Sequence, residues 1–388
     1  MQDAPATFIT ALVHASVYPS AVLLVLDEHR DALMAYTPPR PERGLPPIRI
    51  NLYSDTQTRP TVAMREAMRS AEVGDEQHGN DPTVHRLCDR VGELLGKEAA
   101  MFLPSGTMCN VVAILTHCRS GEEVIAHRTS HILTSEGGAH AAFSGVQILG
   151  LPGERGQFTA EAVRAAIRPR TRYAPAQRLL EVEQTANIGG GTVWPLAQLE
   201  EVTAVARSEG WATHMDGARL MNASVASRTA AKDMAASFDS VWIDFTKGLG
   251  APLGAVLAGS AAFIDEAWRW KQRLGGGMRQ AGICAAACIH ALDHHVGRLA
   301  DDHRNAKILA RGLRQLPGVA VEEPETNLVF FDPAGAGLTA LALIQRMRLQ
   351  GVHLSLSGQR VRACTHLDVT EAMIEEALGG IRREVNTR

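Results

Sequence analysis

From residue 60 to about residue 260 the sequence alternates short apolar runs with amphipathic segments, and this alternation limits the possible folds more than any other feature. The runs "AAMFL", "EEVIAH", "VQILGL" and "RLLEVEQT" have the length of strands. Helical spacing of apolar residues lies between them, as in "LAQLEEVTAVARSEG". Buried strands that alternate with helices pair in parallel, because each helix returns the chain to the same edge of the sheet. We therefore predict an α/β fold with a mostly parallel sheet.

The sequence outside this region indicates an N-terminal extension and a second, smaller domain. Residues 1–47 join an interrupted apolar stretch to the proline-rich "YTPPRPERGLPPIR", and we expect an N-terminal extension of unassigned role there. Residues 48–300 are expected to form the large domain. We predict a smaller C-terminal α+β domain over residues 301–388, where strand-like runs such as "VHLSLSGQRVRACT" alternate with helical segments.

Composition argues against several classes of function. The formal net charge is −3 and the chain has no basic patch, so nucleic-acid binding is not expected. The apolar N-terminal stretch resembles neither a signal peptide nor a membrane span, and no membrane partner is expected. The six scattered cysteines form no CxxC pair, which indicates reduced thiols and a cytoplasmic location. Cys284, Cys288, His290 and His294 have helical spacing, but their Ala-rich surroundings favour packed thiols over metal ligands, so no metal is expected.

A single lysine raises the first question about function. Lys247 follows the apolar run "VWIDF" and precedes a glycine-rich turn in "DFTKGLGA". Taken alone, a lysine at such a corner is best explained as exposed, because burial of its charge is costly. The alternative is an amine held in a dry site, where it can be neutral and nucleophilic.

Two further motifs bear on this choice. In "PSGTMCN", Ser105, Gly106 and Thr107 lie between a strand and a helix, where backbone N–H groups and hydroxyls suit a phosphate, although an ordinary N-cap has the same residues. The motif matches neither of the glycine-rich nucleotide fingerprints, which argues for an isolated phosphate. In "THMDGARL", Asp216 ends an apolar strand. It would either hold a proton on a ligand's ring nitrogen or occupy a turn beside Arg219.

Together these motifs have the order that pyridoxal 5′-phosphate requires. A phosphate-binding loop, an aspartate and a lysine follow one another along an α/β sheet. The loop would anchor the phosphate, the aspartate would keep the pyridine nitrogen protonated, and the lysine would form the Schiff base. We therefore predict pyridoxal 5′-phosphate as the cofactor.

The chain resembles the threonine aldolase family of the β-eliminating lyase superfamily, which has the aspartate aminotransferase fold (fold type I). The likeness runs from about Asn51 to the C-terminus and rests on "SDTQTRPTVAMREAM", "VGDEQHGNDPTVHRL", "GKEAAMFLPSGTMCN", "HMDGARLMNAS", "TKGLGAPLGAVLAG", "LGGGMRQAG" and "VRACTHLDV". The resemblance implies cleavage of β-hydroxy-α-amino acids, such as L-threonine or L-allo-threonine, to glycine and an aldehyde. It also implies a homodimer or homotetramer whose subunits share active sites.

The resemblance assigns roles to the cofactor-binding residues. Lys247 matches the Schiff-base lysine, and Asp216 matches the partner of the pyridine nitrogen. The phosphate loop corresponds to Ser105, Gly106 and Thr107.

Other matched residues concern the substrate. His131 matches a histidine that stacks on the cofactor ring near the substrate hydroxyl, and it acts either as the base or only by stacking, with a water as the base. Ser54, Arg219 and Arg362 match the groups that hold the substrate carboxylate, a task for which a guanidinium fork is suited. Arg219 is also expected beside the cofactor, and Arg279 near the cofactor phosphate of a neighbouring subunit.

Four positions depart from the family pattern. His78 replaces a tyrosine, Gln272 a lysine, and Ala186 a histidine. Alignment puts Tyr173 where a histidine is common; a phenol, whose unperturbed pKa is about 10, would orient the substrate hydroxyl without taking its proton. Two alternatives stay open: an amino-acid racemase or β-eliminating lyase on the same scaffold, and a cofactor-binding protein that has lost catalysis.

Overall fold

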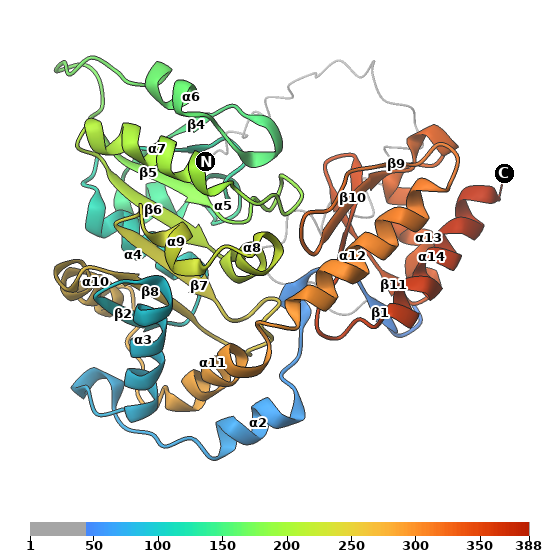
Figure 1. Ribbon diagram of the computed structural model, residues 1–388, viewed down its shortest axis with the longest axis horizontal. Helices are drawn as coiled ribbons and strands as arrows, with labels where there is room; N and C mark the ends of the chain where they lie inside the picture. Colours follow the sequence, from blue (N-terminus) through green and yellow to red (C-terminus); the bar gives the residue numbers. More distant parts are fainter. Residues whose placement is uncertain (1–43, 388) are drawn as a thin grey trace, which may run out of the picture. The chain divides into compact units, whose positions relative to one another are not determined.

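The computed structural model describes residues 44–387 (Figure 1). Residues 1–43, which make up most of the predicted N-terminal extension, lie outside the described residues. From Pro46 on, the described chain forms one compact unit, and Gly44 and Leu45 belong to the unit before it. Within residues 44–387, no helix combines the length and the apolar character needed to cross a membrane.

A seven-stranded sheet is the centre of the larger part of this unit (Figure 1). The strands lie in the order β2-β8-β7-β6-β5-β3-β4; those from β7 to β4 pair in parallel, and β8 pairs antiparallel with both of its neighbours. This arrangement confirms the predicted α/β fold and mostly parallel sheet. The strand bounds are β2 (Ala99–Leu103), β3 (Glu123–His127), β4 (Gln147–Leu151), β5 (Gln177–Glu183), β6 (Ala212–Gly217), β7 (Ser240–Asp244) and β8 (Ala255–Gly259).

Helices cover both faces of this sheet. Met101 and Leu103 of β2 pack in one hydrophobic core with α4 (Gly106–His117) and α10 (Ala261–Arg273), whereas Phe102 between them packs in the core of the other face. That second core includes α3 (Pro82–Leu95), α7 (Leu196–Ser208) and α9 (Ala231–Ala235). The other elements of this part are α2 (Val62–Arg69), α5 (His131–Thr134), α6 (Ala160–Ala165), α8 (Leu220–Ser227) and α11 (Gly282–His294), with the short turns η1 (Asp55–Gln57), η2 (Glu76–His78), η3 (His140–Ser144) and η4 (Glu154–Gly156).

The C-terminal part has a sheet and a core of its own, which confirms the smaller α+β part. Its antiparallel sheet has the order β12-β13-β10-β9; α12 and α13 pack against it, and α14 packs against these two helices. β1 (Ile50–Asn51) pairs in parallel with β11, so that Ile50 and Leu52 belong to this C-terminal core. The predicted domain boundary at residue 300 stays a prediction. The bounds are α12 (Leu299–Arg314), β9 (Ala320–Val321), β10 (Leu328–Asp332), η5 (Ala334–Ala336), α13 (Ala340–Leu349), β11 (Val352–His353), β12 (Ser355–Ser357), β13 (Arg360–Cys364) and α14 (Glu371–Asn386).

The alternation of side chains along β5, β6 and β7 separates apolar from polar residues. Val182, Met215 and Ile243 point into the core on the α3 and α7 face. Their neighbours point to the α4 face, because successive residues of a strand face opposite sides; these are Glu181, Glu183, His214, Asp216, Ser240 and Trp242. Since the three strands are parallel, the last of these residues meet at one edge of the sheet.

Candidate active site

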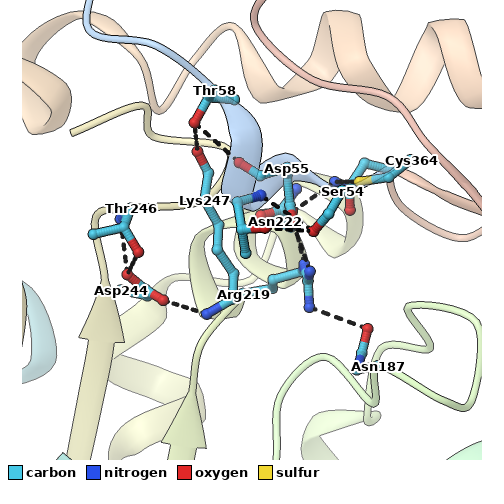
Figure 2. Close-up of polar contacts among 12 residues, drawn as sticks. Ser54, Asp55, Thr58, Asn187, Arg219, Asn222, Asp244, Thr246, Lys247 and Cys364 are labelled. Carbon is cyan, nitrogen blue, oxygen red and sulfur yellow. Dashed lines mark hydrogen bonds and ion pairs between the residues drawn. The ribbon is translucent and has the colours of Figure 1, made fainter. Parts of the chain in front are cut away.

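Lys247 lies just beyond the carboxyl end of β7 and is held at both its backbone and its side chain (Figure 2). The Thr58 hydroxyl donates a hydrogen bond to the Lys247 carbonyl at 2.9 Å. The Lys247 ammonium forms an ion pair with Asp244, and its side chain is only 18% exposed. Asp244 in turn accepts hydrogen bonds from the backbone and hydroxyl of Thr246, both at 2.7 Å. The structure therefore does not support a freely exposed lysine at this corner.

Asp216 ends β6 and is buried, with 1% exposure. Its Oδ1 accepts a hydrogen bond from the Ala218 backbone at 3.0 Å, and its Oδ2 accepts one from Asn110 Nδ2 at 2.9 Å. In the strand register it lies opposite Trp242 of β7. The side chain of Arg219, the alternative local partner, is directed instead to Asp55.

The predicted phosphate loop is the N-terminus of α4. Ser105 Oγ accepts a hydrogen bond from the Met108 backbone at 3.2 Å, so Ser105 is the N-cap. Helix geometry leaves the N–H groups of Gly106 and Thr107 without a partner inside the helix, and these groups suit an anion. A Cβ atom at Gly106 would lie 2.2 Å from the Trp242 ring, so only glycine fits there. An N-cap and an anion site are thus compatible at this helix end.

Trp242 connects these three features. Its ring packs against Gly106, it lies beside Asp216 in the sheet, and its ring centroid is 5.8 Å from Lys247 Nζ. An anion site, a buried carboxylate and a lysine therefore surround one indole ring. This donor set and the close approach at Gly106 fit an aromatic cofactor with a phosphate.

His131 begins α5 and is tied to two carboxylates. Its backbone N–H donates to Glu183 Oε2 at 2.9 Å, and its Nδ1 lies 2.8 Å from Glu136 Oε1. Burial lowers the pKa of His131, but the carboxylates of Glu136, Asp216 and Glu183 outweigh it and raise that pKa above its ordinary value. Because Nδ1 faces Glu136, Nε2 is the nitrogen available to a ligand.

The two arginines of the predicted carboxylate site converge on the loop after β5. Arg362 Nη2 and Arg219 Nη1 both donate to Asn187 Oδ1, at 3.2 and 3.4 Å. Asp55 already binds two nitrogens of Arg219, at 2.7 and 2.8 Å, in a pair that is fully buried (Figure 2). Burial would raise the pKa of Asp55, but the Arg219 charge holds it well below its usual range.

Arg362 is therefore the arginine of this site that has a hydrogen-bond donor left for a ligand. Its Nε is buried and has no hydrogen-bond partner within residues 44–387. Ser54, which precedes Asp55, is also buried, and its hydroxyl accepts from the Thr56 backbone at 3.2 Å. Arg219 is better described as a clamp between Asp55 and Asn187 than as a free carboxylate receptor.

The prediction for Tyr173 is wrong. Tyr173 precedes the amino end of β5, whereas the residues described above follow the carboxyl ends of the strands. Its side chain is 81% exposed and its hydroxyl contacts Arg172. The seven residues of β5, at about 3.3 Å each, put roughly 23 Å between Tyr173 and the site.

Arg279 does not join the site of its own chain. It donates to Asp75 at 2.9 Å, and its side chain is 58% exposed. Its predicted contact with a neighbouring subunit stays a prediction.

Sequence reasoning missed several buried polar residues of this site. The signal for two of them was present, because "LLEVEQ" has an acidic residue at every second position of an otherwise apolar strand. Glu183 contacts His131, and burial together with the Asp216 charge raises the pKa of Glu183 to about 7. Glu181 is buried with both carboxylate oxygens unpartnered among the described residues, and burial raises its pKa well above the ordinary value. Asn110 and Glu136 gave no such signal.

Comparison with known proteins agrees with this site. The sequence profile of the beta-eliminating lyase family matches residues 51–336. Low-specificity L-threonine aldolase 1 of Arabidopsis thaliana is 39% identical over 346 residues, which are 87% of this chain and 97% of that protein. Low specificity L-threonine aldolase of Escherichia coli (strain K12) is 41% identical over 328 residues, 84% of this chain and 96% of that protein.

A solved structure has the same fold. The threonine aldolase of Leishmania major superposes with a TM-score of 0.75 at 22% identity, over 87% of this chain and 99% of that chain. The protein therefore has fold type I, the aspartate aminotransferase fold, as predicted. Within that class, the chain belongs to the beta-eliminating lyase family, and its threonine aldolase relatives confirm the family resemblance found in the sequence.

Proposed function

We propose that this protein is a pyridoxal 5′-phosphate-dependent aldolase, a carbon–carbon lyase that cleaves β-hydroxy-α-amino acids such as L-threonine or L-allo-threonine to glycine and an aldehyde. The observation that carries the proposal is the grouping of Lys247, Asp216 and the N-terminus of α4 around Trp242. The relatives support it, because this chain matches nearly the whole length of two proteins that are named low-specificity L-threonine aldolases.

Product analysis tests this proposal. Purified protein loaded with the cofactor is incubated with a panel of β-hydroxy amino acids, and glycine and aldehyde are measured. An inverted amino acid would instead indicate a racemase, and pyruvate with ammonia a β-eliminating lyase. Absence of any turnover would indicate a cofactor-binding protein without catalysis.

The residues present can hold the cofactor. When bound, pyridoxal 5′-phosphate supplies an electron sink for the electrons released at the α-carbon of an amino acid. Lys247 would bind it at the end of β7, Asp216 would accept a hydrogen bond from its protonated ring nitrogen, and the N–H groups of Gly106 and Thr107 would hold its phosphate.

Arg362 would then orient the substrate through its carboxylate. Its Nε is buried and unpaired among the described residues, and Asn187 holds its Nη2, so a bound carboxylate would complete its donors. Arg219, which Asp55 holds, would support this contact because it also donates to Asn187 Oδ1, and Ser54 would add its hydroxyl to the carboxylate site.

Arg362→Ala is expected to raise KM for amino acids about 10- to 150-fold, because loss of a hydrogen bond to a charged group costs about 1.5–3 kcal/mol. Steady-state kinetics on threonine measure the change. Arg382→Ala, at an exposed position of α14, is the matched control and should leave KM unchanged. If Arg362→Ala left both KM and kcat at wild-type values, Arg362 would not contact the substrate.

His131 would take the proton of the β-hydroxyl. Glu136 accepts the hydrogen on Nδ1, which makes Nε2 the basic nitrogen and orients the ring. Proton transfer to Nε2 requires a neutral ring, and the raised pKa of His131 both strengthens it as a base and increases its charged fraction near neutral pH.

The activity should therefore fall in acid. We expect kcat/KM to decrease as pH is lowered through the pKa of His131, and this decrease should begin at a higher pH than for a free imidazole. Glu136→Gln removes one of the charges that raise this pKa, so it should move the acidic limb to lower pH. Profiles of kcat/KM over pH measure the shift, with Glu161→Gln on the exposed side of α6 as the control.

Retention of the same acidic limb in His131→Asn would contradict this assignment. In that case a water would take the proton, and His131 would act only by stacking on the cofactor. If the acidic limb of kcat/KM stayed at the same pH in Glu136→Gln, Glu136 would have no part in the proton transfer.

We also propose a homodimer or homotetramer with shared active sites. The exposed side chain of Arg279, which donates a hydrogen bond to Asp75, supports a role toward a neighbouring subunit. A cytoplasmic location is proposed because all six cysteines are free thiols.

A further inference from the structure

The side-chain amide of Asn110 lies at the centre of a buried hydrogen-bond network next to the candidate site. Asn110 belongs to α4 and is fully buried. Its Nδ2 lies 2.7 Å from Glu136 Oε1 and 2.9 Å from Asp216 Oδ2. Its Oδ1 lies 2.7 Å from Trp242 Nε1 and 3.1 Å from His214 Nε2. The amide thus uses both of its hydrogens and both of its lone pairs.

Trp242 determines the orientation of this amide. An indole N–H can only donate, so the atom that faces it must be the oxygen of Asn110. The NH₂ group then faces the two carboxylates, and each of them must accept. A reversed amide would put its oxygen against two carboxylates and its hydrogens against the indole N–H.

The same reasoning sets the state of His214. Its Nε2 must carry a hydrogen in order to donate to Asn110 Oδ1, so its Nδ1 accepts from the Ser240 hydroxyl at 2.8 Å. Burial lowers the pKa of His214 to about 3, in agreement with a neutral ring. The network therefore has one direction of donation, toward the carboxylates.

The two carboxylates need this contact because they lie close together. The ligand atoms of Asp216, Glu136 and His131 are all within 4.8 Å of one another. Two carboxylates at such a distance repel each other and tend to share a proton. One N–H donated to each carboxylate offsets this repulsion without transferring a proton.

We propose that Asn110 is a positioning residue that keeps Asp216 and Glu136 as two separate hydrogen-bond acceptors, so that Asp216 serves the cofactor ring nitrogen and Glu136 serves His131. This inference rests on the proposed function. Asn110 acts through the two carboxylates, since its polar atoms are all occupied within the network. One amide thereby links the group that supports the electron sink to the group that orients the base.

Asn110→Ala in the cofactor-loaded protein tests this role, with Ser240→Ala as the matched control. Both variants remove a buried hydrogen-bonding group from the same network, but only Asn110→Ala removes the donors to the carboxylates. We expect kcat to fall about 10- to 100-fold in Asn110→Ala and to stay within about threefold of wild type in Ser240→Ala.

The second measurement is the titration of His131, followed by NMR of histidine-labelled protein. The charged groups that face His131 are Glu136, Asp216 and Glu183. In Asn110→Ala, Glu136 loses a donor that compensates its charge, so His131 should titrate at a higher pH than in wild type. In Ser240→Ala the titration should not move. An unmoved titration in Asn110→Ala, with a loss of kcat that Ser240→Ala shares, would reduce Asn110 to a structural role.

A measurement on the wild-type protein keeps the inference testable if Asn110→Ala does not fold. The amide orientation requires the hydrogen of His214 to be on Nε2, and NMR reports the tautomer directly. A hydrogen on Nδ1 would overturn the inference. Neither NMR result requires turnover: a protein without aldolase activity whose His131 titration shifts would refute the proposed function alone, and an active aldolase without the shift would refute the role of Asn110 alone.

Discussion

Lys247→Ala is expected to lower kcat by more than about a thousandfold and to leave a protein from which dialysis removes the cofactor. The amine lies at the end of β7, is 18% exposed, and is fixed by Asp244 at its tip and by Thr58 at its backbone. Lys271, the one fully buried lysine among residues 44–387, is committed to Glu76 and to the Phe102 carbonyl. Alanine also removes the amine that would be exchanged for the amino group of the substrate.

Covalent labelling separates this result from a simple loss of stability. After borohydride reduction of the wild-type protein, mass spectrometry should find the pyridoxyl group on the peptide that contains Lys247. The reduced variant should carry none, while its circular dichroism matches wild type. Lys232→Ala, at an exposed position of α9, should retain both label and activity. If Lys247→Ala still acquired the label, another lysine would be the one that binds the cofactor covalently.

Asp216→Asn is expected to lower kcat about 10²- to 10³-fold while the cofactor stays bound. The amide has the shape of the carboxylate, but its single oxygen can accept from only one of the two donors, Asn110 Nδ2 or the Ala218 backbone. It carries no charge, however, and so does not keep a pyridine nitrogen protonated. The variant keeps one of these two hydrogen bonds, so we expect it to fold and to bind the cofactor but to lose the stabilisation of charge that develops during the reaction.

Steady-state kcat and the cofactor absorbance together measure this effect. Asp265→Asn, at an exposed position of α10, removes the same charge far from the indole ring and should leave kcat unchanged. If Asp216→Asn turned over at a rate near wild type, protonation of the ring nitrogen would not depend on Asp216. The proposed contact between Asp216 and the ring nitrogen would then be wrong.

The parts of the site that sequence could predict follow from local rules. Lys247 and Asp216 each end or follow a run of apolar residues, and parallel strands bring such ends to one edge. Gly106 was found in the same way, because the chain between β2 and α4 must pass that edge. Placing these residues at one edge required only the alternation of strands and helices, whereas their roles came from the family resemblance.

The parts that sequence could not predict depend on packing between distant segments. Arg219 was expected as a free carboxylate receptor, but Asp55, which lies 164 positions earlier, occupies two of its nitrogens. Tyr173 was placed by alignment through a loop, where no periodicity fixes the register, and it lies at the wrong edge of the sheet. The contacts of Asn110 with Asp216 and Glu136 likewise arise only when α4 settles on the sheet.

The pairing of β1 with β11 determines when this site can be completed during synthesis of the chain. Ile50 lies beside Val352 in that pair, and the two residues after β1, Leu52 and Tyr53, lead directly to Ser54 and Asp55. The seven strands of the large sheet can emerge from the ribosome and associate while β11 is still untranslated, yet the strand that carries Asp55 toward Arg219 has no partner until then. The segment that carries Asp55 is translated before Arg219 but is anchored by β11, so we expect the ion pair between Asp55 and Arg219 to form only after β11 is made. A nascent chain should bind the cofactor before it can recognise an amino acid.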